Sequence, residues 1–124
     1  MNIQDFATGI DIEKISRFDK YSSDKNAPFI TRIYTTKEIE YCFSYKNPAE
    51  HLAVRFCAKE AVYKALSALN IQNIQFKQIE ITNNSDGVPI VKIQNKDYDN
   101  IIIKISLSHG NGNAMASVFA VKTK

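Results

Sequence analysis

A segment near the middle of the chain, residues 48–69, would be apolar around nearly its whole circumference as a helix. From Leu52 to Leu69, thirteen of eighteen residues are apolar. A helix that is apolar on every side is buried, and buried charges need partners. Four charged side chains are nevertheless embedded in this segment: Arg55, Lys59, Glu60 and Lys64. The surroundings of this helix must therefore satisfy these charges.

The spacing of the four charges allows two interpretations. Glu60 and Lys64 can form an ion pair along the helix, whereas Arg55 and Lys59 at the same spacing repel each other by roughly 0.2–0.5 kcal/mol in an isolated helix. In the first interpretation, the long cationic side chains of an amphipathic helix extend to solvent. In the second, Arg55 and Lys59 bind a phosphate beside the Glu60 carboxylate. The pattern leaves both open.

The N-terminal region contains a second acid in an apolar setting. Residues 6–12 predict a short strand that is interrupted by Gly9 and Asp11, and a polar helix is expected to begin at Glu13. Asp11 would then lie at a junction between strand and helix, where it could be the N-cap of the helix. Alternatively, Asp11 and Glu60 could hold Mg²⁺, which takes one or two protein carboxylates and completes its shell with water and phosphate oxygens.

Three cations, Lys14, Arg17 and Lys20, recur at a spacing of three residues and would lie along one side of the N-terminal helix. We call these three residues the basic stripe. With a net charge of +3, the stripe favours an acidic or phosphorylated partner. A non-catalytic module that binds RNA or an acidic protein could carry similar cations. The chain lacks the aromatic platform or glycine-rich loop usual in RNA-binding modules, so no nucleic-acid partner is expected.

Helices are predicted mainly in the first half of the chain. A short helix is expected over residues 28–34, and Thr35 and Glu38 match a capping box that opens another helix. Asn47 is a candidate N-cap for the long helix, with Pro48 at the first helical position.

Strands are predicted mainly in the second half, where β-branched runs are separated by turn residues. Four strands are expected: residues 74–82, 88–93, 101–108 and 114–121. Asp86-Gly87 and the turn at residues 110–113 suit tight hairpins, so both strand pairs should be antiparallel. The sequence therefore predicts a single α+β domain over residues 1–124, with helices in the first half and an antiparallel sheet mainly from the second.

His109 follows a predicted strand and precedes a glycine-rich turn. A lone histidine in this position is usually a polar turn residue. It becomes a candidate phosphate contact or proton acceptor if the fold brings it near Asp11 and Glu60.

The location of the protein is predicted from what the sequence lacks. Cys42 and Cys57 lack the spacing of a disulfide framework or a zinc site, which fits a reducing compartment. No basic and apolar leader opens the chain, and no apolar run approaches about 18 residues. We expect a cytoplasmic protein without a membrane segment.

Four motifs occur in order along the chain. The most specific is Arg55-Phe56-Cys57-Ala58-Lys59-Glu60-Ala61-Val62-Tyr63-Lys64. Three shorter motifs accompany it: Gly9-Ile10-Asp11-Ile12 with Arg17 following, Asp86-Gly87-Val88-Pro89, and Ser106-Leu107-Ser108-His109. Together they resemble the R-F-x-A-K-E-A-x-x-K helix, the G-x-D-I opening, the N/D-G-x-P turn and the S-x-S/T-H strand end of the holo-acyl-carrier-protein synthase family of 4′-phosphopantetheinyl transferases.

This resemblance implies a fold, a reaction and a set of site residues. The enzyme would transfer the phosphopantetheine group of coenzyme A to a serine of an acidic acyl carrier protein and release 3′,5′-ADP. Asp11 and Glu60 would hold Mg²⁺ against the diphosphate, and the basic stripe would receive the carrier. The catalytic residues would be Glu60, Lys64 and His109, with Glu60 or its metal-bound water favoured as acceptor of the serine proton. The residues that would bind the cofactor are Arg55, Lys59, Lys64, Gly87, Pro89, Ser108 and His109.

The resemblance also implies a homotrimer with active sites between subunits. Three positions differ from the residues usual in the family: Ala7, Gly110 and the loop at residues 67–70. These differences concern contacts with the adenosine phosphate rather than the metal carboxylates.

Overall fold

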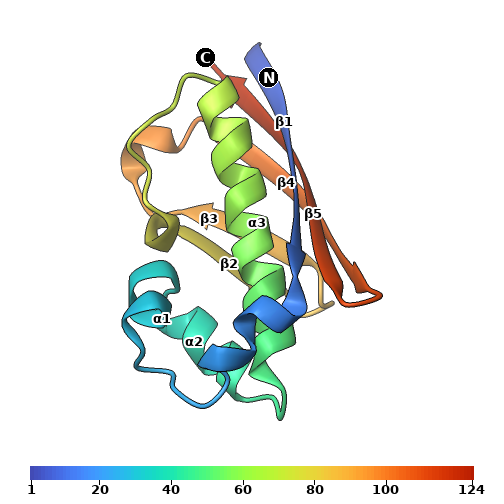
Figure 1. Cartoon of the computed structure of the whole chain (residues 1–124). Coiled ribbons are helices and arrows are strands. Elements are labelled where there is room, and N and C mark those ends of the chain that lie inside the picture. Colours follow the sequence, from blue (N-terminus) through green and yellow to red (C-terminus); the bar gives the residue numbers. More distant parts are fainter.

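The computed structural model describes all residues 1–124, and it confirms the predicted α+β class. A three-stranded antiparallel sheet in the order β1-β5-β4 packs against one long helix, α3, and a separate β2-β3 hairpin lies on the far side of that helix from β1 (Figure 1). None of the helices is both long enough and apolar enough to cross a membrane. The helices are α1 (Pro28–Ile33), α2 (Thr36–Phe43) and α3 (Pro48–Ala68), and the strands are β1 (Ile3–Lys14), β2 (Ile79–Asn83), β3 (Pro89–Ile93), β4 (Ile101–Gly110) and β5 (Asn113–Thr123).

Helix α3 is the buried centre of the molecule, as its sequence predicted. Fourteen of its residues are buried, and these lie on all sides of the helix. Pro48 occupies the first turn, where its missing N–H costs nothing. Asn47 takes the N-cap position, but its side chain makes no capping hydrogen bond, so that part of the prediction is wrong.

The capping box of α2 is confirmed. The Glu38 backbone N–H donates to the Thr35 hydroxyl oxygen at 3.3 Å, and the Glu38 carboxylate accepts from the Thr35 backbone N–H at 2.8 Å. Glu38 is also almost completely buried, at 1% exposure. A capping residue is usually exposed, so this carboxylate must have further partners inside the protein.

The N-terminal strand is longer than the sequence predicted. β1 extends to Lys14, and its pairing with β5 continues as far as Lys14 opposite Asn113. The polar helix expected from Glu13 is therefore wrong, because pairing with β5 overrides the local preference of this segment. A 3₁₀ helix, η1 (Ile15–Tyr21), follows instead. Asp11 lies inside the strand and is not an N-cap.

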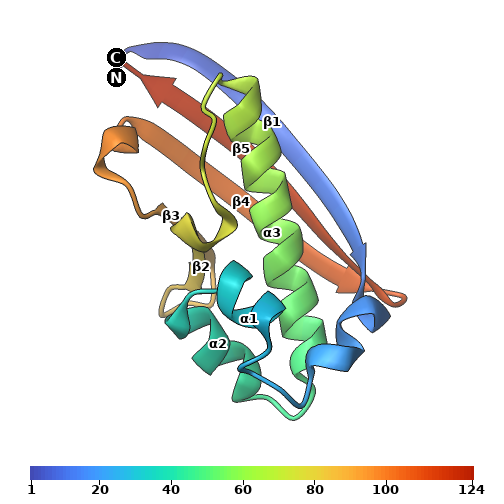
Figure 2. The ribbon, with the colours of Figure 1, turned by 60° about the vertical axis from the view of Figure 1, so that its left-hand side comes forward.

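The two predicted hairpins are confirmed, with one shortened strand. β2 pairs with β3, and β4 pairs with β5, both antiparallel. The strand expected over residues 74–82 begins only at Ile79, because the short 3₁₀ helix η2 (Phe76–Gln78) precedes it. The pairing of β1 with β5 joins both ends of the chain and brings the termini side by side (Figure 2).

β1 crosses α3 at very short range. Gly9 faces the helix, and a Cβ atom at this position would overlap the carbonyl oxygen of Ala61 and lie 3.1 Å from the backbone nitrogen of Ala65. Only a residue without a side chain permits this approach. The contact fixes where the rest of β1, including Asp11, lies along the helix.

We predict that Gly9→Ala destabilises the protein by about 1–3 kcal/mol or more, because overpacking forces β1 away from α3. Gly110→Ala is the matched control, since a Cβ atom there meets no atom within 4 Å. Thermal unfolding of both variants measures the difference. Equal stability of the two variants would contradict the close packing of β1 on α3.

Candidate active site

The edge of β1 and the neighbouring face of α3 bring together two carboxylates and one ammonium group. The Lys64 ammonium donates to Asp11 Oδ1 at 3.2 Å and to the Ile10 carbonyl at 3.0 Å. Burial raises the pKa of Glu60, and the nearby Asp11 carboxylate raises it further. The predicted ion pair between Glu60 and Lys64 is not formed, because Lys64 reaches across to β1 instead. We call Asp11, Glu60 and Lys64 the carboxylate cluster.

Glu13 is a further acid beside this cluster, and the sequence analysis missed it. Residues two apart on a strand face the same side, so Glu13 and Asp11 both face α3. Burial raises the pKa of Glu13 to about 7, and the proximity of Asp11 adds to this rise. The Glu13 carboxylate pairs with Arg17 at 2.6 Å. On a strand, the two-residue spacing of Asp11 and Glu13 places both side chains on one face. We expected a helix from Glu13, so the spacing did not identify Glu13 as a neighbour of Asp11.

The carboxylate cluster fits a hard divalent cation. Asp11 Oδ2 is buried and has no hydrogen-bond partner, which is costly for a carboxylate oxygen unless a cation, or a proton shared with the neighbouring Glu13, satisfies it. Mg²⁺ needs only one or two protein carboxylates, since water and phosphate supply its other ligands. No group of three or more potential ligand side chains converges on one point. The chemistry of these carboxylates therefore fits Mg²⁺, and binding of the ion at Asp11 and Glu60 stays a prediction.

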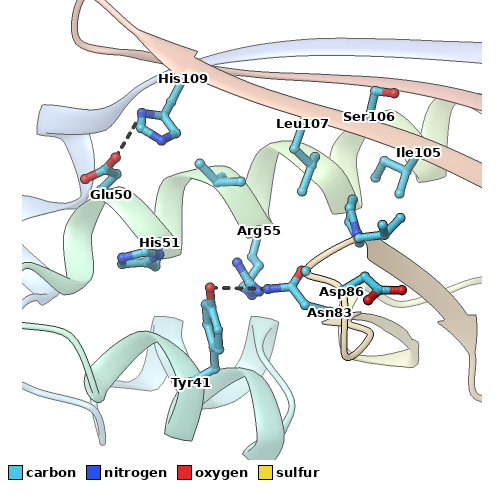
Figure 3. A pocket seen from close by; sticks show the side chains of 14 residues that line it. Tyr41, Glu50, His51, Arg55, Asn83, Asp86, Ile105, Ser106, Leu107 and His109 are labelled. Atoms are coloured by element: carbon cyan, nitrogen blue, oxygen red, sulfur yellow. Dashed lines mark hydrogen bonds and ion pairs between the residues drawn. The ribbon is translucent and has the colours of Figure 1, made fainter.

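A cavity of about 550 Å³ lies on the other side of α3, between the helix, β4 and the β2-β3 turn (Figure 3). The Arg55 guanidinium lies 3.9 Å from the centre of the Tyr41 ring, and Arg55 Nε is buried without a partner. Tyr41 in turn accepts a hydrogen bond from the Asn83 amide at 3.3 Å. The cavity lining includes the predicted residues Arg55, Gly87, Pro89 and His109.

The turn at one end of this cavity is preorganised. Asn84 Oδ1 accepts hydrogen bonds from the backbone N–H groups of Asp86 and Val88, at 2.9 and 3.0 Å. Gly87 has a φ of +81°, a conformation that residues with side chains rarely adopt. The turn therefore presents its backbone to the cavity in one defined shape.

His109 lies at the opposite end of the cavity from this turn. Its Nδ1 lies 2.9 Å from a carboxylate oxygen of Glu50, as Figure 3 shows. A carboxylate at Nδ1 holds a proton on that nitrogen and leaves Nε2 free for a ligand. Glu50 and His109 also border a second cavity, of about 650 Å³, whose lining includes Lys14. Nothing in the sequence indicated that Glu50 would pair with His109.

Two predicted cofactor-binding residues lie elsewhere. Lys59 was expected to bind phosphate, but its side chain is completely buried and its ammonium pairs with Glu38 at 2.7 Å. Ser108 was expected to act beside His109. It is opposite Met115 on the outer face of the sheet, because alternate residues of a strand face opposite sides. Neither residue lines the cavity of this chain, and binding of the cofactor by either residue stays a prediction.

Only two of the three residues of the basic stripe lie on a helix. Arg17 and Lys20 share one side of η1, because a 3₁₀ helix has three residues per turn. Arg17 lies over the Phe56 ring at 5.3 Å and is half-exposed. Lys14, by contrast, is the last residue of β1 and lies outside the helix.

The predicted site residues thus form two groups on opposite flanks of α3. The carboxylate cluster lies beside β1, and the cavity residues lie beside β4 and the β2-β3 hairpin. β5 separates these two strands, so β1 and β4 lie about 10 Å apart at the usual strand spacing. No member of the carboxylate cluster lines the cavity. His109 therefore does not share this cavity with Asp11 and Glu60 within one chain.

Comparison with known proteins agrees with this fold and these motifs. The chain is 43% identical over 110 residues to a protein of Thermodesulfovibrio yellowstonii named holo-[acyl-carrier-protein] synthase, covering 89% of this chain and 93% of the relative. A protein of the same name from Geobacter sp. (strain M21) is 38% identical over 119 residues, covering 91% and 95% of the two chains.

Solved structures show the same architecture. The crystal structure of a holo-(acyl-carrier-protein) synthase from Bacillus anthracis in complex with CoA (3′,5′-ADP) matches with a TM-score of 0.75 at 29% identity, covering 95% of this chain and 96% of that one. The family described as the 4′-phosphopantetheinyl transferase superfamily matches residues 7–118. The match thus spans both flanks of α3, from β1 to β5, and the chain belongs to the 4′-phosphopantetheinyl transferase superfamily.

Proposed function

We propose that this protein is a holo-[acyl-carrier-protein] synthase, which transfers the phosphopantetheine group of coenzyme A to a serine of an acyl carrier protein and releases 3′,5′-ADP. The observation that supports this most is the carboxylate cluster, in which Lys64 pairs with one oxygen of Asp11, the other Asp11 oxygen is buried without a partner, and Glu60 is near enough for Asp11 to raise its pKa. The names of the relatives from Thermodesulfovibrio yellowstonii and Geobacter support the same activity.

The reaction needs charge neutralisation more than covalent chemistry. Attack on the diphosphate develops negative charge on phosphate oxygens and on the leaving 3′,5′-ADP. Mg²⁺ bound at Asp11 and Glu60 would supply Lewis-acid stabilisation of that charge. Lys64, whose ammonium pairs with Asp11 at the cluster, would bind the same phosphates.

Glu60 is our preferred acceptor for the proton of the carrier serine, directly or through a bound water. His109 is the alternative base. It lies on the cavity flank of α3, so in one chain it is separated from the cluster.

The cavity is proposed to bind the adenosine end of coenzyme A. Arg55 and His109 supply a cation and a ring nitrogen for phosphate oxygens, and the turn from Gly87 to Pro89 supplies backbone groups for the base. The basic stripe of Lys14, Arg17 and Lys20 would bind the acidic carrier protein. We propose that the whole chain, residues 1–124, acts as one domain in the cytoplasm.

A complete site requires residues from both flanks, so we propose that copies of the chain assemble with the β1 flank of one beside the β4 flank of the next. The outer face of the sheet supports this arrangement, because apolar side chains gather there and the Phe6 and Phe119 rings lie 6.0 Å apart. A contiguous exposed apolar patch is typical of a protein interface. The large exposed residues of β1 and β5 are Ile3, Phe6, Ile10, Ile12, Met115 and Phe119. A closed ring of three such contacts gives the homotrimer implied by the family resemblance.

The first prediction tests the reaction. Wild-type protein mixed with coenzyme A, Mg²⁺ and an apo acyl carrier protein should raise the carrier mass by one phosphopantetheine unit. Glu60→Gln and Asp11→Asn should each lower kcat/KM by about 10²-fold or more while the fold is retained, since each removes a carboxylate that would hold Mg²⁺ against the negatively charged diphosphate. Asp5→Ala, an exposed acid on the same strand as Asp11, is the control. A carrier of unchanged mass, or wild-type rates in both variants, would refute the proposal.

A second prediction tests cation binding without activity. Folding raises the pKa of Glu13 from 4.5 to about 7, so the folded state binds the proton more tightly. The contribution of Glu13 to the stability of the metal-free protein should therefore be fully present below about pH 4.5 and be lost as the pH rises through about 7. Mg²⁺ competes with protons for the proposed ligands Asp11 and Glu60, and the pKa of Glu60 is also raised, so Mg²⁺ should raise Tm by a few degrees at pH 8 and much less at pH 5. An equal effect of Mg²⁺ on Asp11→Asn would contradict a site at this cluster.

A third prediction tests the shared site. Glu60→Ala and Arg55→Gln lie on opposite flanks, and each alone should be nearly inactive. Random mixing of the two variants by co-refolding should restore about a quarter of the sites, because some sites combine two intact flanks. Glu60→Ala mixed with Asp11→Ala should restore nothing, since both changes lie on one flank. Failure of the first mixture to regain activity would show that each chain forms its site alone.

A further inference from the structure

The buried ammonium of Lys59 has a full set of partners. It donates to a carboxylate oxygen of Glu38 at 2.7 Å, to the Phe76 carbonyl at 2.9 Å and to the Ile79 carbonyl. An ammonium group has three N–H donors, and all three are used. Neither the Lys59 nor the Glu38 side chain is exposed to solvent. The Lys59 ammonium therefore binds only groups in the interior of the protein and has no donor left for a ligand.

Glu38 connects the pair to two further segments. One carboxylate oxygen also accepts from the Thr35 backbone N–H at the start of α2, and the other accepts from the Ile81 backbone N–H at 2.9 Å. The ion pair consequently ties α2, α3 and β2 together at a single buried point. Replacing either partner alone leaves an uncompensated charge there.

The β2-β3 hairpin depends on this point for its placement. It has no hydrogen-bonded ladder to the main sheet, and an isolated two-stranded hairpin is only marginally stable. Two of the five β2 residues, Ile79 and Ile81, are bonded to the ion pair through their backbones. The same hairpin carries the turn that forms one end of the cavity. A shift of the hairpin would therefore move Gly87 and Pro89.

We propose that Lys59 and Glu38 are positioning residues for coenzyme A: their buried ion pair holds the β2-β3 turn at the cavity. This rests on the proposed function, because the cavity must bind the adenosine end of the substrate. The lysine of the R-F-x-A-K-E motif thus acts through the hairpin rather than by touching phosphate. Loss of the pair should weaken binding of coenzyme A and leave the carboxylate cluster on the other flank intact.

Glu38→Gln is the direct test, since it keeps the shape of the side chain but removes its charge and one acceptor oxygen. We expect KM for coenzyme A to rise about tenfold, with kcat at saturating coenzyme A changed by less than about twofold. KM for the carrier protein should not change. Glu40→Gln, an exposed acid on the same helix, should behave as wild type. An unchanged KM for coenzyme A, or equal losses in kcat and kcat/KM, would overturn the proposal.

Hydrogen exchange provides a readout that does not depend on transfer activity. Amides of the hairpin, residues 79–93, should exchange faster in Glu38→Gln than in wild type, whereas those in the middle of α3 should stay protected. If Glu38→Gln does not fold, the double variant Glu38→Gln/Lys59→Met removes both charges and avoids an unpaired one. Absence of transfer activity in the wild-type protein would refute the proposed function but not the positioning role of the ion pair. Unchanged exchange of the hairpin in either variant would refute the positioning role.

Discussion

The contact between Gly9 and Ala61 is the constraint on which the arrangement of this protein depends. β1 can lie directly on α3 only because no side chain separates the two backbones at that point. The inner face of β5 continues this close packing with small buried residues, and the Cys57 thiol of α3 donates to the Ala114 carbonyl at 3.5 Å. This close contact between β1 and α3 determines how near Asp11 lies to the helix. The position of the carboxylate cluster therefore depends on the packing of β1 against α3 as well as on the residues of the sequence motifs.

α3 distributes its charged residues to different sides, and each side has a different task. Glu60 and Lys64 face β1, Arg55 faces the cavity beside Tyr41, and Lys59 is enclosed by the hairpin and α2. A helix that is buried all round can hold such charges only if each has a specific partner. In this protein the partners are a strand carboxylate for Lys64, an aromatic ring for Arg55 and a second buried acid for Lys59. The partly buried Glu60 would find its partner in the Mg²⁺ of our proposal. The two substrate-facing sides are then joined, in our proposal, by neighbouring copies of the chain.

The sequence predicted the elements well and their mutual contacts poorly. The apolar circumference of α3, the capping box at Thr35 and the glycine turns of both hairpins are local signals, and each is confirmed. The pairing of β1 with β5 is a contact between the two ends of the chain, which no local pattern encodes. For the same reason the partner of Lys59 was missed, since Glu38 lies 21 residues earlier on another helix. Spacing within one helix suggested a phosphate site, but tertiary contacts gave this lysine an internal role.

The most direct test of this account is a crystal structure of the protein with coenzyme A and Mg²⁺. The account predicts that the diphosphate contacts Asp11 and Glu60 of one copy while the adenosine lies against Arg55 and the Gly87 turn of its neighbour. Binding of the entire coenzyme to residues of a single chain would contradict the shared site. A diphosphate bound away from both carboxylates would contradict the role of the cluster itself.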